Sequence, residues 1–151
     1  MKYRNDLKYF IRDGELMPIE KFDEKLILSN NSVYEVIRVR DAEPLFLEEH
    51  LERMQNSAGL VFGSYKIDKH KIAALLRELI TKNGLVEGNV KVELMKESED
   101  FGLLLYFIPH RYPTEEQYRK GIRMKLQFDE RILPNAKISN WTVRGLSLIH
   151  I

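Results

Sequence analysis

The segment LPNAKISN, residues 133–140, places a lysine among small and apolar residues. Lysine is almost never fully buried in a protein unless it is paired. If Lys137 enters an apolar site, desolvation lowers the pKa of its amine from about 10.4 and makes the free amine available near neutral pH. A free amine in a dry site is what Schiff-base chemistry needs. The alternative is a strand residue whose charged head reaches water, and the segment alone does not decide between the two.

A second set of polar residues lies on an expected helix, in the segment EEHLERMQNSA. At about 100° per residue, apolar side chains cluster on one face, and His50, Arg53 and Ser57 form a stripe on its border. A side chain on that border can be half buried and still point at a polar ligand. The planar fork of Arg53 suits phosphate or carboxylate, because it can donate two parallel hydrogen bonds. An ion pair with Glu49 or Glu52 is the simpler alternative, and periodicity alone favours it.

The segment SVYEVIRVR, residues 32–40, alternates as a strand and puts Tyr34 and Arg38 on one face. A phenol and a cation on one face can together bind a negatively charged substrate. Tyr34 is equally an ordinary strand residue, and Arg38 an ordinary solvated edge residue. Glu35 shares the opposite face with apolar residues, so it needs a partner or a place at the rim.

Composition restricts the classes of function. The chain has 24 basic and 23 acidic residues and a net charge of +1, which gives no electrostatic case for nucleic acid or an anionic membrane. Cysteine is absent, and no histidine pair has the spacing of a helical zinc site, so we expect no metal. No apolar run approaches the roughly 20 residues of a membrane span, and the first residues lack a signal-peptide core. We therefore expect a cytoplasmic protein.

Hydrophobic periodicity predicts an α+β fold. Asp13-Gly14 is a hairpin turn signal, and a second helix is expected from a cap at Asp68 to a stop at Asn83-Gly84. The strand at 102–108 is apolar on both faces and should be central in its sheet. The other expected elements are the strand at 32–40, a helix at about 48–59, a strand at 89–95 joined to 102–108 by the polar KESEDF, and strands at 122–128 and 136–141.

The composition changes at residues 109–121, PHRYPTEEQYRKG, which is typical of a linker. We expect a small N-terminal domain over 1–108, this interdomain linker, and the truncated start of a second domain over 122–145. The last six residues, LSLIHI at 146–151, match what a common transposon-end sequencing adaptor encodes in one reading frame. We therefore expect a non-native tail there and a natural chain that continues, although a short apolar strand is the alternative.

Three of these segments occur in an order that resembles the class IV aminotransferase family, the fold-type IV pyridoxal-phosphate (PLP) enzymes. They are SVYEVIRV, FLEEHLERMQNSA and PNAKISN, and the resemblance covers nearly all of residues 8–145. Its most specific features are His50-x-x-Arg53 and the distance from it to Lys137-x-x-Asn140. The family includes branched-chain aminotransferases, D-amino-acid aminotransferases and aminodeoxychorismate lyases. The resemblance implies a small N-terminal α/β domain followed by the first strands of the PLP-lysine domain.

The resemblance also implies roles for individual residues. Lys137 would bind PLP covalently and later move the substrate proton, and Arg53 would hold the cofactor phosphate. Tyr34 matches a position that faces the substrate carboxylate in part of the family, and Arg38 lies on the same face. The implied reaction is transamination between an amino acid and a 2-oxo acid, in a homodimer acting on small molecules.

Some features depart from the family pattern. The chain reads SNNSV where many members have a glycine before the Tyr/Phe-Glu strand, and the loop after VELMKES is short and acidic. The arginine and histidine that bind the substrate carboxylate in D-amino-acid aminotransferases are not visible there. The chain also stops before the acidic partner of the pyridine nitrogen, so with half of a site it is expected to be inactive alone.

Two other functions remain open at this point. One is a lyase that uses the same cofactor and expels pyruvate from aminodeoxychorismate. The other is a non-catalytic α+β binding module in which the amine of Lys137 simply reaches water.

Overall fold

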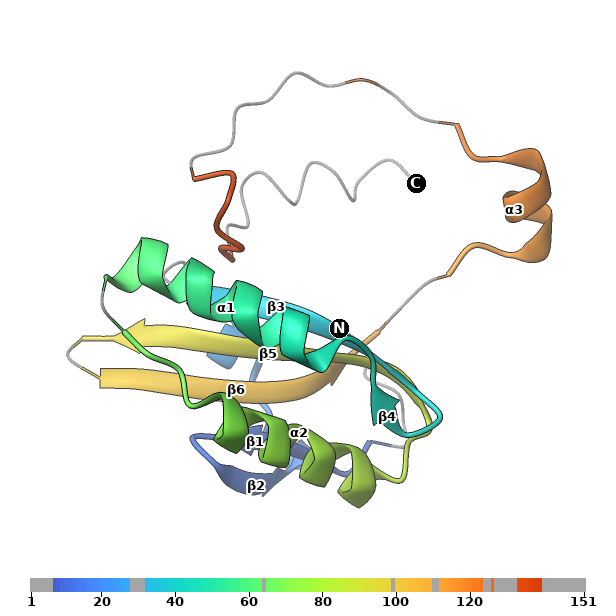
Figure 1. Ribbon diagram of the computed structural model, residues 1–151. Helices are drawn as coiled ribbons and strands as arrows, with labels where there is room; N and C mark the ends of the chain where they lie inside the picture. The colour runs from blue at the N-terminus through green and yellow to red at the C-terminus, as the bar shows by residue number, and fades with distance from the viewer. Residues whose placement is uncertain are drawn as a thin grey trace.

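A six-stranded antiparallel sheet forms the centre of the protein, in the order β2-β1-β6-β5-β3-β4 (Figure 1). The computed structural model describes residues 7–27, 32–63, 65–98, 100–109, 112–123, 126 and 133–139. β6 lies between β1 and β5, which confirms that the doubly apolar strand is central. The strands are β1 Tyr9–Arg12, β2 Glu15–Pro18, β3 Ser32–Arg40, β4 Glu43–Pro44, β5 Glu87–Glu97 and β6 Asp100–Ile108.

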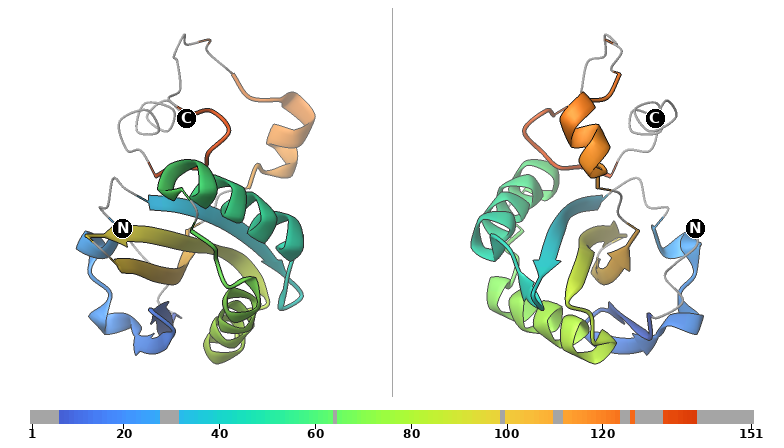
Figure 2. Two further views of the ribbon diagram at one scale, coloured as in Figure 1. Left: turned by 60° about the vertical axis from the view of Figure 1, so that its left-hand side comes forward. Right: turned by 90° about the vertical axis from the view of Figure 1, so that its right-hand side faces the viewer.

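Two helices, α1 Leu47–Phe62 and α2 Lys69–Asn83, cover one face of the sheet (Figures 1 and 2). α1 packs on β3, while α2 packs on β1 and β6. Two short 3-10 helices, η1 Ile19–Lys21 and η2 Glu24–Ile27, follow β2. Apolar residues from this segment pack against the opposite face of the sheet. The predicted α+β fold is confirmed.

The core is larger on the helix-covered face. Val33, Ile37 and Val39 point from β3 towards the helices, as the alternation of this strand predicts. The apolar stripe predicted for the second helix is fully buried there: Ile72, Leu75, Leu76, Leu79 and Ile80. A smaller core on the other face contains Phe10, Ile27, Met95, Leu104 and Tyr106.

The ends of the helices follow local sequence signals. The side chain of Asp68 accepts a hydrogen bond from the backbone N–H of Lys71, and α2 stops where Gly84 adopts a φ of 64°. The expected cap and stop of this helix are therefore confirmed. α1 runs past the expected residue 59, because Val61 and Phe62 still pack against the core, and it ends at Gly63 with a φ of 75°.

Three expectations about strands need correction. The polar KESEDF is not a six-residue loop, because β5 and β6 stay paired as far as Glu97 and Asp100. Most of the expected strand at 122–128 lies outside the described residues; its described residues are not in a strand, and Ile122 and Leu126 are 52% and 90% exposed. The expected strand at 136–141 is shorter in the described part: Ile138 forms an isolated bridge with Val33.

The linker range also contains a helix that the sequence analysis did not expect. α3, Glu115–Lys120, begins at a capping box formed by Thr114 and Gln117 and stands clear of the sheet (Figure 1). The domain boundaries remain predictions, and the suspected tail at 146–151 lies outside the described residues. Among the described helices, none is both long and apolar enough to cross a membrane.

Candidate functional site

Lys137 lies against the outer edge of β3. Its backbone carbonyl accepts a hydrogen bond from the Tyr34 N–H at 3.0 Å, and the Ser139 N–H donates to the Ser32 carbonyl at 3.0 Å. On the other side, the Lys137 N–H donates to the Ser57 hydroxyl of α1 at 3.1 Å. Main-chain bonds to a strand and a helix therefore fix the position from which the Lys137 side chain extends.

Glu35 is the centre of the polar contacts in this region. It points from β3 towards α1, and its side chain is 0% exposed. Arg53 donates to it through Nε at 2.7 Å and through Nη2 at 2.5 Å. His50 Nδ1 lies 2.9 Å from Oε2, and the Lys137 amine lies 3.3 Å from the same oxygen. The partner that the sequence analysis required for Glu35 is thus a set of three side chains.

All three residues of the border stripe of α1 make contacts in this cluster. His50 and Arg53 contact Glu35, and Ser57 holds the backbone of Lys137. The alternative ion pair of Arg53 with Glu49 or Glu52 is wrong: in the described structure Arg53 pairs with Glu35, and Glu52 pairs with Lys69. The reason is burial, since the unexposed Glu35 needs a cation and the exposed glutamates of α1 do not.

Electrostatics sets the protonation of Glu35. Burial by itself raises the pKa of a carboxyl group. Hydrogen bonds from Arg53 and His50, together with the charges of Lys137 and Arg53, outweigh that effect and lower the pKa of Glu35 to about 2. The carboxylate is therefore ionised near neutral pH. It faces the Arg53 guanidinium and the Lys137 amine.

The other two predicted site residues lie on the opposite face of β3. The Lys137 amine is 5.4 Å from the ring centroid of Tyr34, so Tyr34 borders the cluster. Arg38 is exposed, and its guanidinium lies 4.4 Å from the ring centroid of Tyr112. The Tyr112 hydroxyl donates to Asn89 Oδ1 at 2.9 Å, so Arg38 contacts the start of the linker. The structure brings Lys137, Arg53 and Tyr34 together and places Arg38 in a separate contact.

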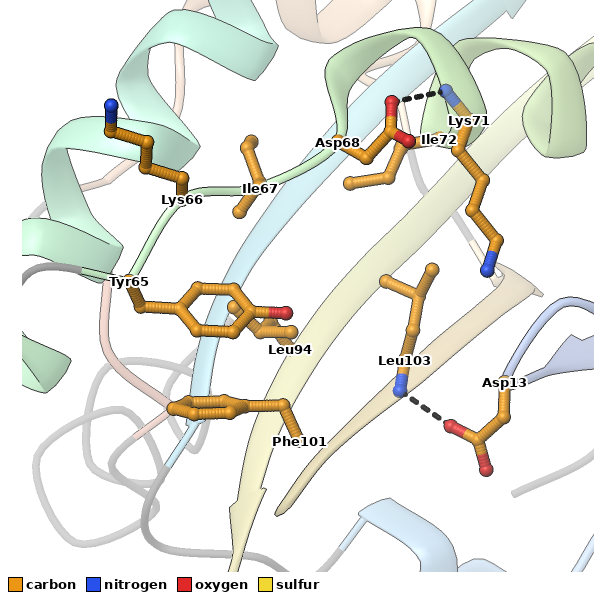
Figure 3. Close-up of a pocket in the computed structure, with 10 residues that line it drawn as sticks. All are labelled: Asp13, Tyr65, Lys66, Ile67, Asp68, Lys71, Ile72, Leu94, Phe101 and Leu103. Atoms are coloured by element: carbon orange, nitrogen blue, oxygen red, sulfur yellow. Dashed lines mark hydrogen bonds between the residues drawn. The ribbon is translucent and has the colours of Figure 1, made fainter. Parts of the chain in front are cut away.

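A cavity of about 220 Å³ lies elsewhere, between the start of α2 and the strands β5 and β6 (Figure 3). Its wall is mostly apolar, with Tyr65 and Phe101 stacked at 3.9 Å between ring centroids. Its carboxylates are already engaged, because Asp13 accepts from the Leu103 N–H and Asp68 caps α2. None of the four predicted site residues lines this cavity.

The sequence model of the amino-transferase class IV family matches residues 32–149, which is most of the chain. The chain belongs to the class IV aminotransferase family. This family is PLP-dependent, and the match includes every residue of the cluster around Glu35.

Among individual relatives of this class IV chain, aminodeoxychorismate lyase of Bacillus subtilis (strain 168) is 31% identical over 62 residues. That match spans 41% of this chain and 21% of the lyase. Branched-chain amino acid aminotransferase of Escherichia coli has the same fold, with a TM-score of 0.58 at 17% identity over 69% of this chain and 41% of that one. The enzyme of Thermobaculum terrenum in its PLP form gives a TM-score of 0.60 at 15% identity, over 78% and 43% of the two chains.

Replacing Glu35 by glutamine removes its negative charge, and the free energy of unfolding should then depend less on pH. A carboxyl group whose pKa falls from 4.5 to about 2 on folding stabilises the protein above pH 4.5, and the gain is lost as the pH falls towards 2. That pKa shift corresponds to a contribution of about 3 kcal/mol to the free energy of unfolding. Urea unfolding should therefore find Glu35→Gln markedly less stable than wild type at pH 7 and much closer to it at pH 3.

Glu78→Gln is the matched control, because Glu78 is an exposed residue of α2. It should change the free energy of unfolding little at either pH. A Glu35→Gln variant as destabilised at pH 3 as at pH 7 would show that shape rather than charge matters at this position.

Proposed function

We propose that this chain supplies the amine and one phosphate-binding group of a PLP-dependent aminotransferase, which transfers an amino group between an amino acid and a 2-oxo acid. The observation that carries the proposal is the meeting of the Lys137 amine and the Arg53 guanidinium at one buried carboxylate. The chain spans about two fifths of the aminotransferases with the same fold, so the remaining contacts of the site would come from other residues.

The donor set fits PLP. Lys137 offers a primary amine, the group that bonds to an aldehyde. Arg53 donates to Glu35 through Nε and Nη2, and with its side chain 51% exposed it keeps further N–H groups for an anion such as a phosphate. We therefore assign the covalent hold to Lys137 and a phosphate contact to Arg53.

When bound, PLP supplies an electron sink for the negative charge that develops at the α-carbon of the amino acid. The Lys137 amine would take the proton from that carbon. Hydrogen bonds to β3 and to α1 hold the backbone from which its side chain extends. Glu35 is a positioning residue, because it contacts both Lys137 and Arg53 and is itself sealed from water. Tyr34 would border the substrate, and a contact of Arg38 with the substrate carboxylate remains a prediction.

The second candidate is a lyase that releases pyruvate from aminodeoxychorismate. The match to the Bacillus subtilis lyase, 31% identical over 62 residues, supports it. Lys137 and Arg53 would keep the same roles in either reaction. For the complete enzyme we propose small-molecule substrates, a homodimer and a cytoplasmic location.

Supplying each substrate separately to the complete enzyme tests the reaction. An aminotransferase should convert an amino acid and a 2-oxo acid into the exchanged pair, with no dependence on aminodeoxychorismate. A lyase should release pyruvate from aminodeoxychorismate without any amino acceptor. Lys137→Ala should abolish whichever activity is present, because it removes the covalent anchor and the base together, and normal turnover in that variant would refute the assignment.

Arg53→Ala should weaken the binding of PLP. Truncating one side of a buried charge pair costs about 2–5 kcal/mol, and the half-exposed position of Arg53 places the expected loss at the lower end. A loss of about 2–3 kcal/mol is a 30- to 150-fold higher dissociation constant for PLP. Arg53→Lys should recover part of it, because a point charge cannot replace the bidentate fork.

Titration of the apo enzyme with PLP, followed by absorbance, measures this effect. Arg77→Ala serves as the control, since Arg77 is exposed on α2, and it should leave the dissociation constant unchanged. A rise of less than about threefold in Arg53→Ala would remove Arg53 from the phosphate site.

A further inference from the structure

The cavity between the start of α2 and the strands β5 and β6 has an apolar floor and a charged rim (Figure 3). Ile67, Ile72 and Leu94 form the floor and are at most 8% exposed. The rings of Tyr65 and Phe101 form one wall, and their centroids lie 3.9 Å apart. The volume of about 220 Å³ exceeds the roughly 150 Å³ of an apolar cavity that binds benzene, so it has room for one aromatic ring and a short polar group.

Hydrogen bonds hold two sides of this cavity in place. The Gln55 side chain of α1 donates to the Tyr65 carbonyl at 2.9 Å and accepts from the Ile67 N–H at 2.9 Å. On the other side, the Asp13 N–H donates to the Leu103 carbonyl at 2.8 Å, and Asp13 Oδ1 accepts from the Leu103 N–H at 2.8 Å. The fold itself therefore shapes the cavity, as is usual for sites that bind small molecules.

Lys71 brings a cation to the rim of the cavity. Its side chain extends from α2 across the β1–β2 turn (Figure 3), where a Cβ on Gly14 would lie 3.6 Å from its amine. No carboxylate of the residues that the structure describes pairs with this amine, whereas Lys69 of the same helix pairs with Glu52. The ammonium group of Lys71 thus keeps its three donors for an anion.

The acidic groups of the rim limit the charge of a ligand. Asp13 accepts from the Leu103 N–H at 2.8 Å and from Arg12 Nε at 2.9 Å, and Asp68 accepts from the Lys71 N–H at 2.9 Å. These engaged carboxylates offer little to an ammonium group, but their negative charge disfavours a second anionic group beside Lys71. The free cation, the aromatic wall and the apolar floor together match a ring that carries a single negative charge.

We propose that this cavity binds a small aromatic monocarboxylate, with its ring against Tyr65 and Phe101 and its carboxylate on the Lys71 amine. The ring gains apolar contact with the floor and an offset or edge contact with the aromatic wall. The carboxylate receives a charge-assisted hydrogen bond from Lys71. Neither Lys137 nor Arg53 lines the cavity, so the inference goes beyond the proposed function and holds for either PLP reaction.

Methyl NMR of the complete enzyme, with carbon-13 in the isoleucine δ1 methyl groups, tests this site directly. Phenylacetate should shift the methyl resonances of Ile67 and Ile72 saturably, with a dissociation constant of about 1 mM or lower, because its ring lies over these side chains. Phenylacetamide has the same ring without the charge and should bind about tenfold more weakly, since hydrogen bonds to charged groups are stronger. Acetate, which lacks the ring, should leave both resonances unshifted.

Lys71→Met removes the cation at an exposed position. It should weaken the binding of phenylacetate about tenfold and that of phenylacetamide less than about threefold, so most of the preference for the acid disappears. Lys82→Met is the matched control, because Lys82 is exposed in the last turn of the same helix, and it should keep the wild-type preference.

The inference is overturned if phenylacetate leaves the Ile67 and Ile72 resonances unshifted, or if Lys71→Met keeps the wild-type preference for the acid. It is equally overturned if 2-phenylethylamine binds this cavity more tightly than phenylacetate. Leu103→Trp places a ring in the cavity from β6 and should abolish the shifts caused by phenylacetate, so undiminished binding in this variant contradicts the proposal. Binding at the PLP site alone would instead shift the Ile138 resonance and ignore Lys71→Met, which also contradicts it.

Discussion

The burial of the Glu35 carboxylate is the constraint on which the rest of the site depends. Burying a charged carboxylate costs free energy unless well-placed partners compensate it. For Glu35 these partners are Arg53, His50 and Lys137. The three partners come from α1 and from a segment about a hundred residues later in the chain than Glu35. Satisfying one carboxylate therefore requires β3, α1 and the Lys137 segment to assemble together, and the same contacts place an amine beside a guanidinium.

The edge of β3 determines what Lys137 can reach. β5 occupies one side of this strand, and residues 137–139 pair with the other side near its N-terminal end. From the edge, the amine contacts Glu35 on the helix-covered face and the ring of Tyr34 on the opposite face. The two faces carry separate ion pairs: Glu35 pairs with Arg53 and Lys137 on the helix-covered face, and Glu93 pairs with Lys91 on the opposite face.

Local patterns in the sequence predicted most of the fold. The alternation of β3, the buried stripe of α2 and the caps at Asp68 and Gly84 are set by neighbours along the chain, so they could be read directly. The length of the β5–β6 hairpin and the helix α3 were missed, because polar residues such as Glu97 and Thr114 are compatible with a loop as well as with a paired strand or a capping box.

The site was harder to predict than the fold. Periodicity placed Arg53 on the border of α1 but could not choose its partner, because Glu49 and Glu52 are closer in sequence than Glu35. The choice depends on burial, which only the packing of α1 on β3 determines. The ion pair of Lys91 and Glu93 was missed for the same reason, since charged residues in a strand indicate a solvated face until another layer covers them.

The central claim is that the Lys137 amine is the group that bonds to PLP. Borohydride reduction of the complete enzyme in the presence of PLP, followed by peptide mass spectrometry, tests it most directly. The account predicts one stable pyridoxyl group, on the peptide that contains Lys137, and none on the exposed Lys96 of β5. A reduced enzyme with no pyridoxyl group, or with the group on another lysine, would contradict the account and favour a binding module in which Lys137 serves only to neutralise Glu35.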